Sequence, residues 1–133
     1  MIDVTCAIIT DKDKILAVQR GPETDHPFLW EFPGGKTGKG ETDEEAICRE
    51  IREELSVEVE ITGRLGTVEQ DYGNKQIRLI PFVCRICGGS LHLTEHIAFC
   101  WILPEQTSLL NWSEADLKLI RENSIFFGQN KKD

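Results

Sequence analysis

The stretch Arg49–Glu54 reads REIREE and carries three glutamates within five residues. On an α-helix, where each residue turns by about 100°, Glu50, Glu53 and Glu54 fall on one narrow face. Glu50 and Glu54 are a like-charge pair at i and i+4, which destabilises a helix unless a cation lies between them. The alternative is a solvated helix face on which Arg49 pairs with acids one turn away. The spacing therefore raises the possibility of a cation site.

The glutamates need a helix to position them, and the sequence predicts one over residues 42–55. Thr42 followed by Glu45 three residues later is typical of a capping box at a helix start. Ile47, Ile51 and Leu55 recur every four residues and form an apolar stripe beside the carboxylates. The three glutamates should therefore lie at the edge of the hydrophobic core.

The other predicted elements are mostly strands. Two apolar runs, 4–10 and 15–19, suggest a hairpin across the polar DKDK, and further strands are expected over 57–61, 77–87 and 97–103. Ser113 and Asp116 suggest a second capping box that opens a helix to about residue 121. Strands interrupted by one helix and closed by another predict an α/β (α+β) fold, with a mixed sheet between helices. The tail 128–133 is expected to fray.

Composition and charge narrow the class of protein. A chain of 133 residues with 40% hydrophobic residues fits one globular domain, which we expect to span residues 1–133. The formal charge of −8 argues against a nucleic-acid polymer as partner, because phosphate-backbone binders need a basic face. The sequence shows neither a signal peptide nor an apolar run of membrane-spanning length, so we expect a cytoplasmic protein without a membrane partner. It does not decide between a monomer and a homodimer.

Five cysteines are an odd count, which favours reduced thiols over a disulfide framework. Cys84 and Cys87 form a CxxC pair, and a zinc site there would need His92 or His96 as further ligands. Because that region reads as strand, we favour the interpretation of these cysteines as small buried apolar residues.

The glutamates also belong to a longer pattern. Gly35 is followed after five residues by Glu41, and Glu41 after seven residues by Arg49–Glu54 and then Val57. This pattern resembles the Nudix box, the signature of the Nudix hydrolase family. One position departs from it, since the box ends in glycine where this chain has Ser56. That glycine follows the helix in a left-handed conformation, which serine adopts at a cost of about 1 kcal/mol, so we expect a less stable turn and an intact site.

The resemblance covers nearly the whole chain, including LAVQR and WEFPGGK, and looks like the MutT-type branch of that family. It implies a Nudix α/β/α sandwich and hydrolysis of a nucleoside triphosphate to the monophosphate and pyrophosphate. It also implies Mg²⁺ or Mn²⁺ as cofactor, since hard carboxylate oxygens suit these ions. By this resemblance the metal ligands are Gly34, through its carbonyl, and Glu50, Glu53, Glu54 and Glu95. Glu41 is implied as a supporting group of the same catalytic carboxylate network.

Several further residues are candidates to bind the substrate, a small-molecule nucleotide. Arg20, Lys36 and Lys39 lie where they can reach phosphate oxygens, although for each one taken singly a plain surface cation is the favoured interpretation. Tyr72 is a candidate to stack on the base, as is Phe32, for which core packing is the favoured use.

Asp116 matches the position where MutT-type enzymes place a polar residue against the base, and the alternative is a capping role with Ser113. An ionised aspartate only accepts hydrogen bonds and suits a cytosine amino group, so Asp116 favours a cytosine nucleotide unless burial keeps its carboxyl group protonated. The substrate is thus either an oxidised purine such as 8-oxo-dGTP or a cytidine-type triphosphate.

Two other functions stay open at this point. A Nudix-fold binding module without catalysis commonly lacks box glutamates, and this chain retains every one of them. A diphosphatase for another nucleoside diphosphate derivative, such as a nucleotide sugar, would share the same box.

Overall fold

The computed structural model of the chain describes residues 1–128, and the predicted fraying of the tail falls, from residue 129 on, outside the described residues. The described elements follow one another in the order β1 (Ile2–Asp11), β2 (Lys14–Gln19), β3 (Trp30–Glu31), β4 (Gly34–Lys36), α1 (Asp43–Leu55), β5 (Val57–Arg64), β6 (Val68–Asp71), β7 (Gln76–Gly89), β8 (Ala98–Ile102), the 3₁₀ helix η1 (Pro104–Leu109) and α2 (Glu114–Glu122).

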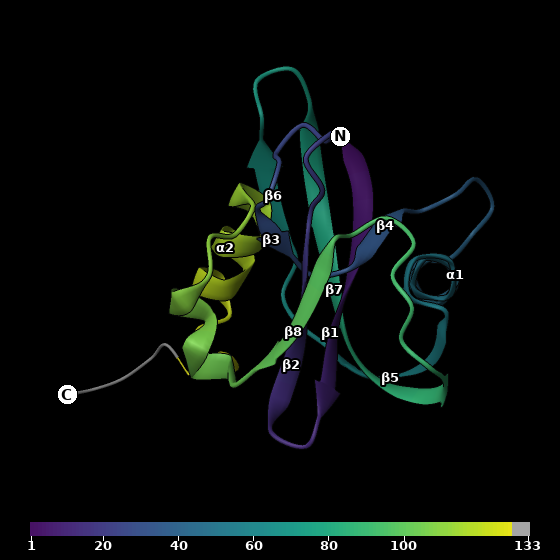
Figure 1. Cartoon of the computed structure of the whole chain (residues 1–133). Coiled ribbons are helices and arrows are strands. Elements are labelled where there is room, and N and C mark those ends of the chain that lie inside the picture. The colour runs from purple at the N-terminus through teal and green to yellow at the C-terminus, as the bar shows by residue number, and fades with distance from the viewer. Residues whose placement is uncertain (129–133) are drawn as a thin grey trace.

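The strands of residues 1–128 form one mixed sheet (Figure 1). β1 and β7 run parallel at its centre, and the other pairings are antiparallel. The predicted hairpin is confirmed, since β1 pairs with β2 through Thr10 opposite Ile15. α1 and α2 lie on opposite sides of the sheet, which confirms the predicted sandwich with a mixed sheet between helices.

Alternation along β1 divides the core into two layers. Cys6 and Ile8 belong to the hydrophobic cluster on the α2 side, whereas Ala7 and Ile9 belong to the cluster on the α1 side. Successive strand residues point to opposite faces, so a central strand covered on both faces must be apolar at every position. Ile47, Ile51 and Leu55 are completely buried in the α1-side cluster. The predicted stripe therefore fixes which face of α1 meets the sheet.

Both ends of α1 match the prediction. Thr42 Oγ1 accepts a hydrogen bond from Glu45 N at 3.1 Å, and Glu45 Oε1 accepts one from Thr42 N at 3.0 Å, which completes the capping box. Glu45 therefore caps the helix and does not pair with Arg49. Ser56 has φ 62° and ψ 30°, the left-handed conformation expected where the box has glycine.

The start of α2 differs from the prediction. The helix begins after Ser113 as expected, but among the described residues the Ser113 side chain makes no capping hydrogen bond. Asp116 Oδ1 instead accepts a hydrogen bond from Phe32 N at 3.0 Å, on the segment between β3 and β4. The predicted capping box is therefore wrong, because a tertiary donor takes the carboxylate.

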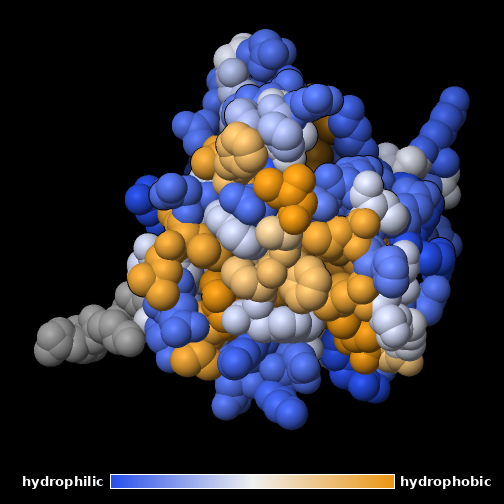
Figure 2. Space-filling view, in the orientation of Figure 1, coloured by the Kyte–Doolittle hydropathy of each residue, from blue (hydrophilic) through white to orange (hydrophobic). Residues whose placement is uncertain are grey.

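The surface shows two further features. Apolar side chains gather on the face that carries β8 (Figure 2), where Ile97 and Phe99 are exposed. Cys84 is buried but Cys87 is exposed, so the prediction of buried cysteines holds for only one member of the CxxC pair. Within residues 1–128 no helix is long and apolar enough to cross a membrane.

Candidate active site

Arg49 gathers three of the predicted carboxylates around its guanidinium group. Its Nε lies 2.6 Å from Glu41 Oε2, and its Nη1 lies 3.0 Å from Glu50 Oε2 and 3.1 Å from Glu53 Oε1. Arg49 Nη2 also donates to the carbonyl oxygen of Lys36, at the end of β4. Arg49 thus supplies the positive charge that the crowded carboxylates require, and it ties α1 to the glycine-rich segment.

Glu54 occupies a different environment from the other glutamates of α1. Its side chain is buried, and its Oε1 accepts a hydrogen bond from Gly34 N at 3.2 Å. Burial, together with the negative charges of Glu95, Glu50 and Glu31, raises the pKa of Glu54 to about 9. Glu54 is therefore a carboxylate whose ionised form lacks sufficient positive charge nearby.

β4 and α1 approach each other closely at Gly35 and Glu50. A Cβ atom added to Gly35 would lie 2.3 Å from the Glu50 carboxyl carbon, closer than any real contact. The Glu50 carboxylate therefore lies directly against the backbone of Gly35, and a side chain at position 35 would have to displace it.

The donor set suits a divalent cation, although its members are not assembled around one point. Within residues 1–128, no three His, Cys, Asp or Glu side chains are arranged so that they can hold a metal ion together. Arg49 binds Glu50 and Glu53, so these two must turn from the guanidinium group to join Glu54 and Glu95. The oxygen-only donors and the charge-deficient Glu54 fit Mg²⁺ or Mn²⁺. Two of the predicted ligands, Glu50 and Glu53, are thus held by a competing cation, Arg49.

A cavity of about 250 Å³ runs from Glu54 to the start of α2. Eight of the residues predicted for the site line it, and these are Arg20, Phe32, Gly34, Lys36, Glu54, Tyr72, Glu95 and Asp116. Glu41, Glu50 and Glu53 are not among the residues that line it, and neither is Lys39. The structure therefore brings the helix carboxylate Glu54 and the predicted base-binding residues together in one cavity.

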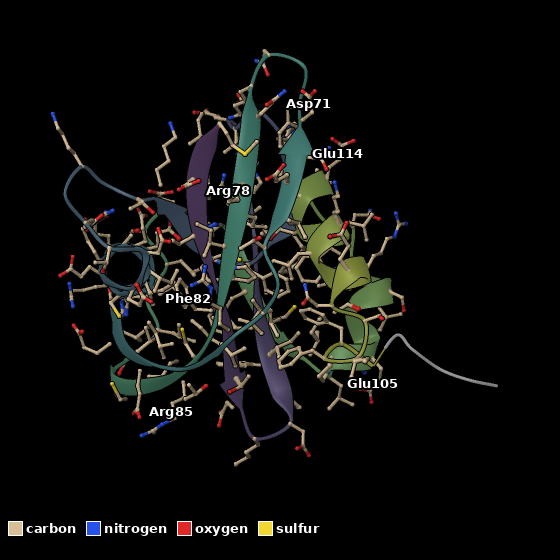
Figure 3. The ribbon with its side chains drawn as sticks, turned by 180° about the vertical axis from the view of Figure 1, so that it is seen from behind. Asp71, Arg78, Phe82, Arg85, Glu105 and Glu114 are labelled. Carbon is tan, nitrogen blue, oxygen red and sulfur yellow. The ribbon has the colours of Figure 1, made fainter. Side chains whose placement is uncertain are left out.

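The far end of the cavity is formed where α2 begins beside β6, and Figure 3 shows Glu114, in the first turn of α2, next to that strand. The Tyr72 hydroxyl accepts a hydrogen bond from Ala115 N at 3.1 Å, and the Tyr72 ring lies 5.6 Å from the His26 ring. Phe32 packs on Trp112 with ring centroids 4.8 Å apart, as its favoured core role predicts. Tyr72 is thus fixed on one wall of the cavity.

Asp116 is buried in the same region. Burial and the nearby charge of Glu31 raise the pKa of Asp116 well above its ordinary value. This favours a protonated carboxyl group, which can both donate and accept a hydrogen bond. The ionised form, which would favour a cytosine amino group, is therefore the less favoured one.

Sequence reasoning missed a network of side-chain contacts around Glu31, beside Asp116. Glu31 binds Arg20 Nη1 at 2.9 Å through one oxygen and His96 Nε2 at 2.9 Å through the other. Arg20 is therefore already paired with Glu31, and its predicted phosphate contact would compete with this partner. Glu31 lies in the WEFPGGK segment that supports the Nudix resemblance, but the segment by itself does not indicate which side chains Glu31 binds. Lys75, in the turn before β7, also lines the cavity and was not predicted.

The family named NUDIX domain matches residues 1–122. The chain belongs to the Nudix family. Among its relatives, the CTP pyrophosphohydrolase of Escherichia coli strain K12 is 34% identical over 120 residues, which cover 90% of this chain and 89% of the relative. The 8-oxo-dGTP diphosphatase of Proteus vulgaris is 34% identical over 100 residues, which cover 74% of this chain and 88% of the relative.

The solved structures agree with this assignment. The solution structure of the E. coli ORF135 protein matches this Nudix fold with a TM-score of 0.82 at 30% identity, and the match covers 99% of this chain and 94% of the other. Relatives named as pyrophosphohydrolases and diphosphatases make this chain a Nudix hydrolase. The resemblance seen in the box residues is thereby confirmed.

Proposed function

We propose that this Nudix hydrolase is a MutT-like, Mg²⁺- or Mn²⁺-dependent diphosphatase that converts a nucleoside triphosphate to the monophosphate and pyrophosphate. The observation that carries the proposal is the single cavity shared by Glu54, Glu95 and Lys36 at one end and by Tyr72 and Asp116 at the other. A nucleoside triphosphate needs two such ends. The triphosphate needs oxygen ligands for its cation, and the base needs an aromatic ring and a hydrogen-bonding group. The names of the relatives support both candidate substrates.

The residues at the phosphate end would act as a unit. Gly34, Glu50, Glu53, Glu54 and Glu95 would hold the divalent ion, which when bound neutralises charge developing at phosphorus and lowers the pKa of the attacking water. Glu41 keeps Arg49 in place through two hydrogen bonds, of 2.6 and 3.1 Å, so its role is to support the ligands. Lys36 lines the cavity at this end and would contact phosphate oxygens.

The base end supports 8-oxo-dGTP and cytidine-type nucleotides alike. A protonated Asp116 offers one donor and one acceptor, which suits the O6 and N1–H edge of an oxidised guanine or the N3 and N4 edge of cytosine. Tyr72 would stack against the base, since its hydroxyl is held at Ala115 and its ring faces the cavity. Removal of 8-oxo-dGTP would be a pool-sanitising role.

The first test is a nucleotide panel combined with ligand variants. Pyrophosphate release should be measured with canonical, oxidised and methylated triphosphates at saturating Mg²⁺. Glu53→Gln and Glu54→Gln should each lower kcat by at least about 10²-fold, the scale for removing a principal charge-stabilising group. Glu60→Gln is the matched control, because Glu60 pairs with Arg85 on the β5–β7 surface, outside the cavity. Wild-type turnover by either box variant would refute the ligand assignment, and a wild type inactive on the whole panel would favour a binding module.

A further inference from the structure

We infer that Thr94 is a positioning residue that holds Glu95 against the metal-binding end of α1. This inference rests on the proposed function, in which Glu95 is a metal ligand. Glu95 lies on the connection between β7 and β8, and its charge acts on Glu54. A ligand on a connection is held less firmly than one on a helix unless other contacts fix the chain around it.

The connection is bonded to the carboxyl end of α1. The last four carbonyl groups of a helix have no partner within the helix. Here Ser56 N takes the carbonyl of Arg52, and His92 N takes the carbonyl of Leu55 at 2.9 Å. Thr94 binds the two carbonyl groups between them, those of Glu53 and Glu54.

Thr94 makes these two contacts with both of its polar groups. Thr94 Oγ1 donates to Glu53 O at 3.0 Å and lies 3.3 Å from Glu54 O, while Thr94 N donates to Glu54 O at 3.1 Å. The two carbonyls that Thr94 binds therefore belong to Glu53 and Glu54, two of the three glutamates of α1 proposed as metal ligands. The residue next along the chain, Glu95, is a further proposed ligand.

A second anchor follows directly after Glu95. His96 Nε2 lies 2.9 Å from Glu31, and Ile97 N donates to Gln19 O at 3.0 Å. Glu95 is thus held between a contact to α1 and a contact to the β2–β3 side of the cavity. Of these two anchors, Thr94 is the one that joins the segment of Glu95 to α1, which carries the other proposed carboxylate ligands.

The test is a calorimetric titration of the intact protein with Mn²⁺ at pH 7.5. Thr94→Val removes the hydroxyl and keeps the shape, and it should weaken Mn²⁺ binding about tenfold, as loss of a group that orients a ligand does. Thr94→Ser restores the hydroxyl and should stay within about twofold of wild type. Thr62→Val is the matched control, because Thr62 Oγ1 likewise donates to a backbone carbonyl, that of Val83, on an exposed strand. Melting temperatures of all variants, measured without metal, show how much each hydroxyl contributes to the fold.

A double-mutant cycle separates positioning of Glu95 from support of the helix. If Thr94 acts through Glu95, Thr94→Val should weaken Mn²⁺ binding less than about twofold in a Glu95→Gln background, because coupled residues are not additive. A full tenfold loss in that background would overturn the inference, as would a Thr94→Val protein with lower melting temperature and wild-type affinity. A wild type that binds no Mn²⁺ would overturn the proposed function as well, whereas normal wild-type binding with unchanged variants overturns this inference alone.

Discussion

Asp116 is a carboxyl group whose role depends on its protonation. Its Oδ1 takes the hydrogen bond of Phe32 N, and its burial near Glu31 raises its pKa. A carboxyl group with a raised pKa in the folded state stays neutral there at pH values at which the same group in the unfolded chain, with a pKa near 4, is already ionised. The contribution of Asp116 to the free energy of unfolding is therefore fully present below its unfolded-state pKa and is lost as pH rises through its folded-state pKa.

This gives a prediction for Asp116→Asn, since an amide keeps one acceptor and one donor but never ionises. Without metal, the variant should be more stable than wild type at pH 8, and the difference should shrink as pH falls toward 4.5. Thermal melts in chelator across this range measure it. The ranking of cytosine and 8-oxoguanine nucleotides by kcat/KM should stay as in wild type, because the hydrogen-bonding pattern is retained.

An ionised Asp116 would give a different pattern. Asp116→Asn would then weaken use of cytosine nucleotides and improve use of 8-oxo-dGTP, with a change in relative kcat/KM of up to about one to two powers of ten. Asp116→Ala is the control, because it loses both hydrogen-bonding groups and should lose activity under either protonation state. A melting difference independent of pH would contradict the neutral carboxyl group.

At the scale of elements, local signals predicted the regular structure well. The capping box and apolar stripe of α1 and the β1–β2 hairpin are local in sequence, and the structure confirms them. The short strands β3 and β4 and the strand β6 were missed, because β3 and β4 lie in a glycine- and proline-rich segment and all three are defined by their pairing partners. Asp116 was assigned to a cap from spacing alone, whereas a donor 84 residues away takes its side chain.

The part of the candidate site whose residues lie close together in the sequence was predictable. Spacing placed the glutamates of α1 on one face, but only the fold reveals that Arg49 holds two of them while Glu54 is buried beside Gly34. The Glu31 network joins three separate segments, so no spacing rule could have assembled it.

Ser56 carries the element-scale prediction. Its φ of 62° places a Cβ atom in the left-handed region, where a non-glycine residue costs about 1–2 kcal/mol. Ser56→Gly should therefore raise the free energy of unfolding by about 1 kcal/mol and the melting temperature by a few degrees, with kcat unchanged. Ser56→Ala separates relief of backbone strain from loss of the hydroxyl group. It keeps the Cβ atom and removes only the hydroxyl, so it should show no gain in stability. Lower stability of Ser56→Gly would mean that the turn is not strained by serine.

At the scale of the whole molecule, the acidic balance fits the proposed chemistry. The formal charge of −8 and the carboxylates of the cavity repel a free triphosphate but attract one that carries a divalent ion. The sandwich brings these carboxylates together by packing α1 on one face of the sheet, while α2 brings Asp116 to the cavity from the other (Figure 1). The clustered carboxylates therefore impose a stability cost on the fold when no cation is bound.

Divalent metal should relieve this cost and stabilise the protein as a whole. Mg²⁺ or Mn²⁺ at about 100 times its dissociation constant would add about 2.7 kcal/mol to the free energy of unfolding, which corresponds to several degrees in melting temperature. Glu54→Gln should be more stable than wild type without metal, because it removes a buried carboxylate surrounded by Glu95, Glu50 and Glu31. It should also gain less from metal, because one ligand is lost.

Thermal melts at matched ionic strength, with NaCl in place of the divalent salt, distinguish binding from screening. Glu60→Gln should respond as wild type does, and equal metal-induced shifts in wild type and Glu54→Gln would show that Glu54 does not bind the ion.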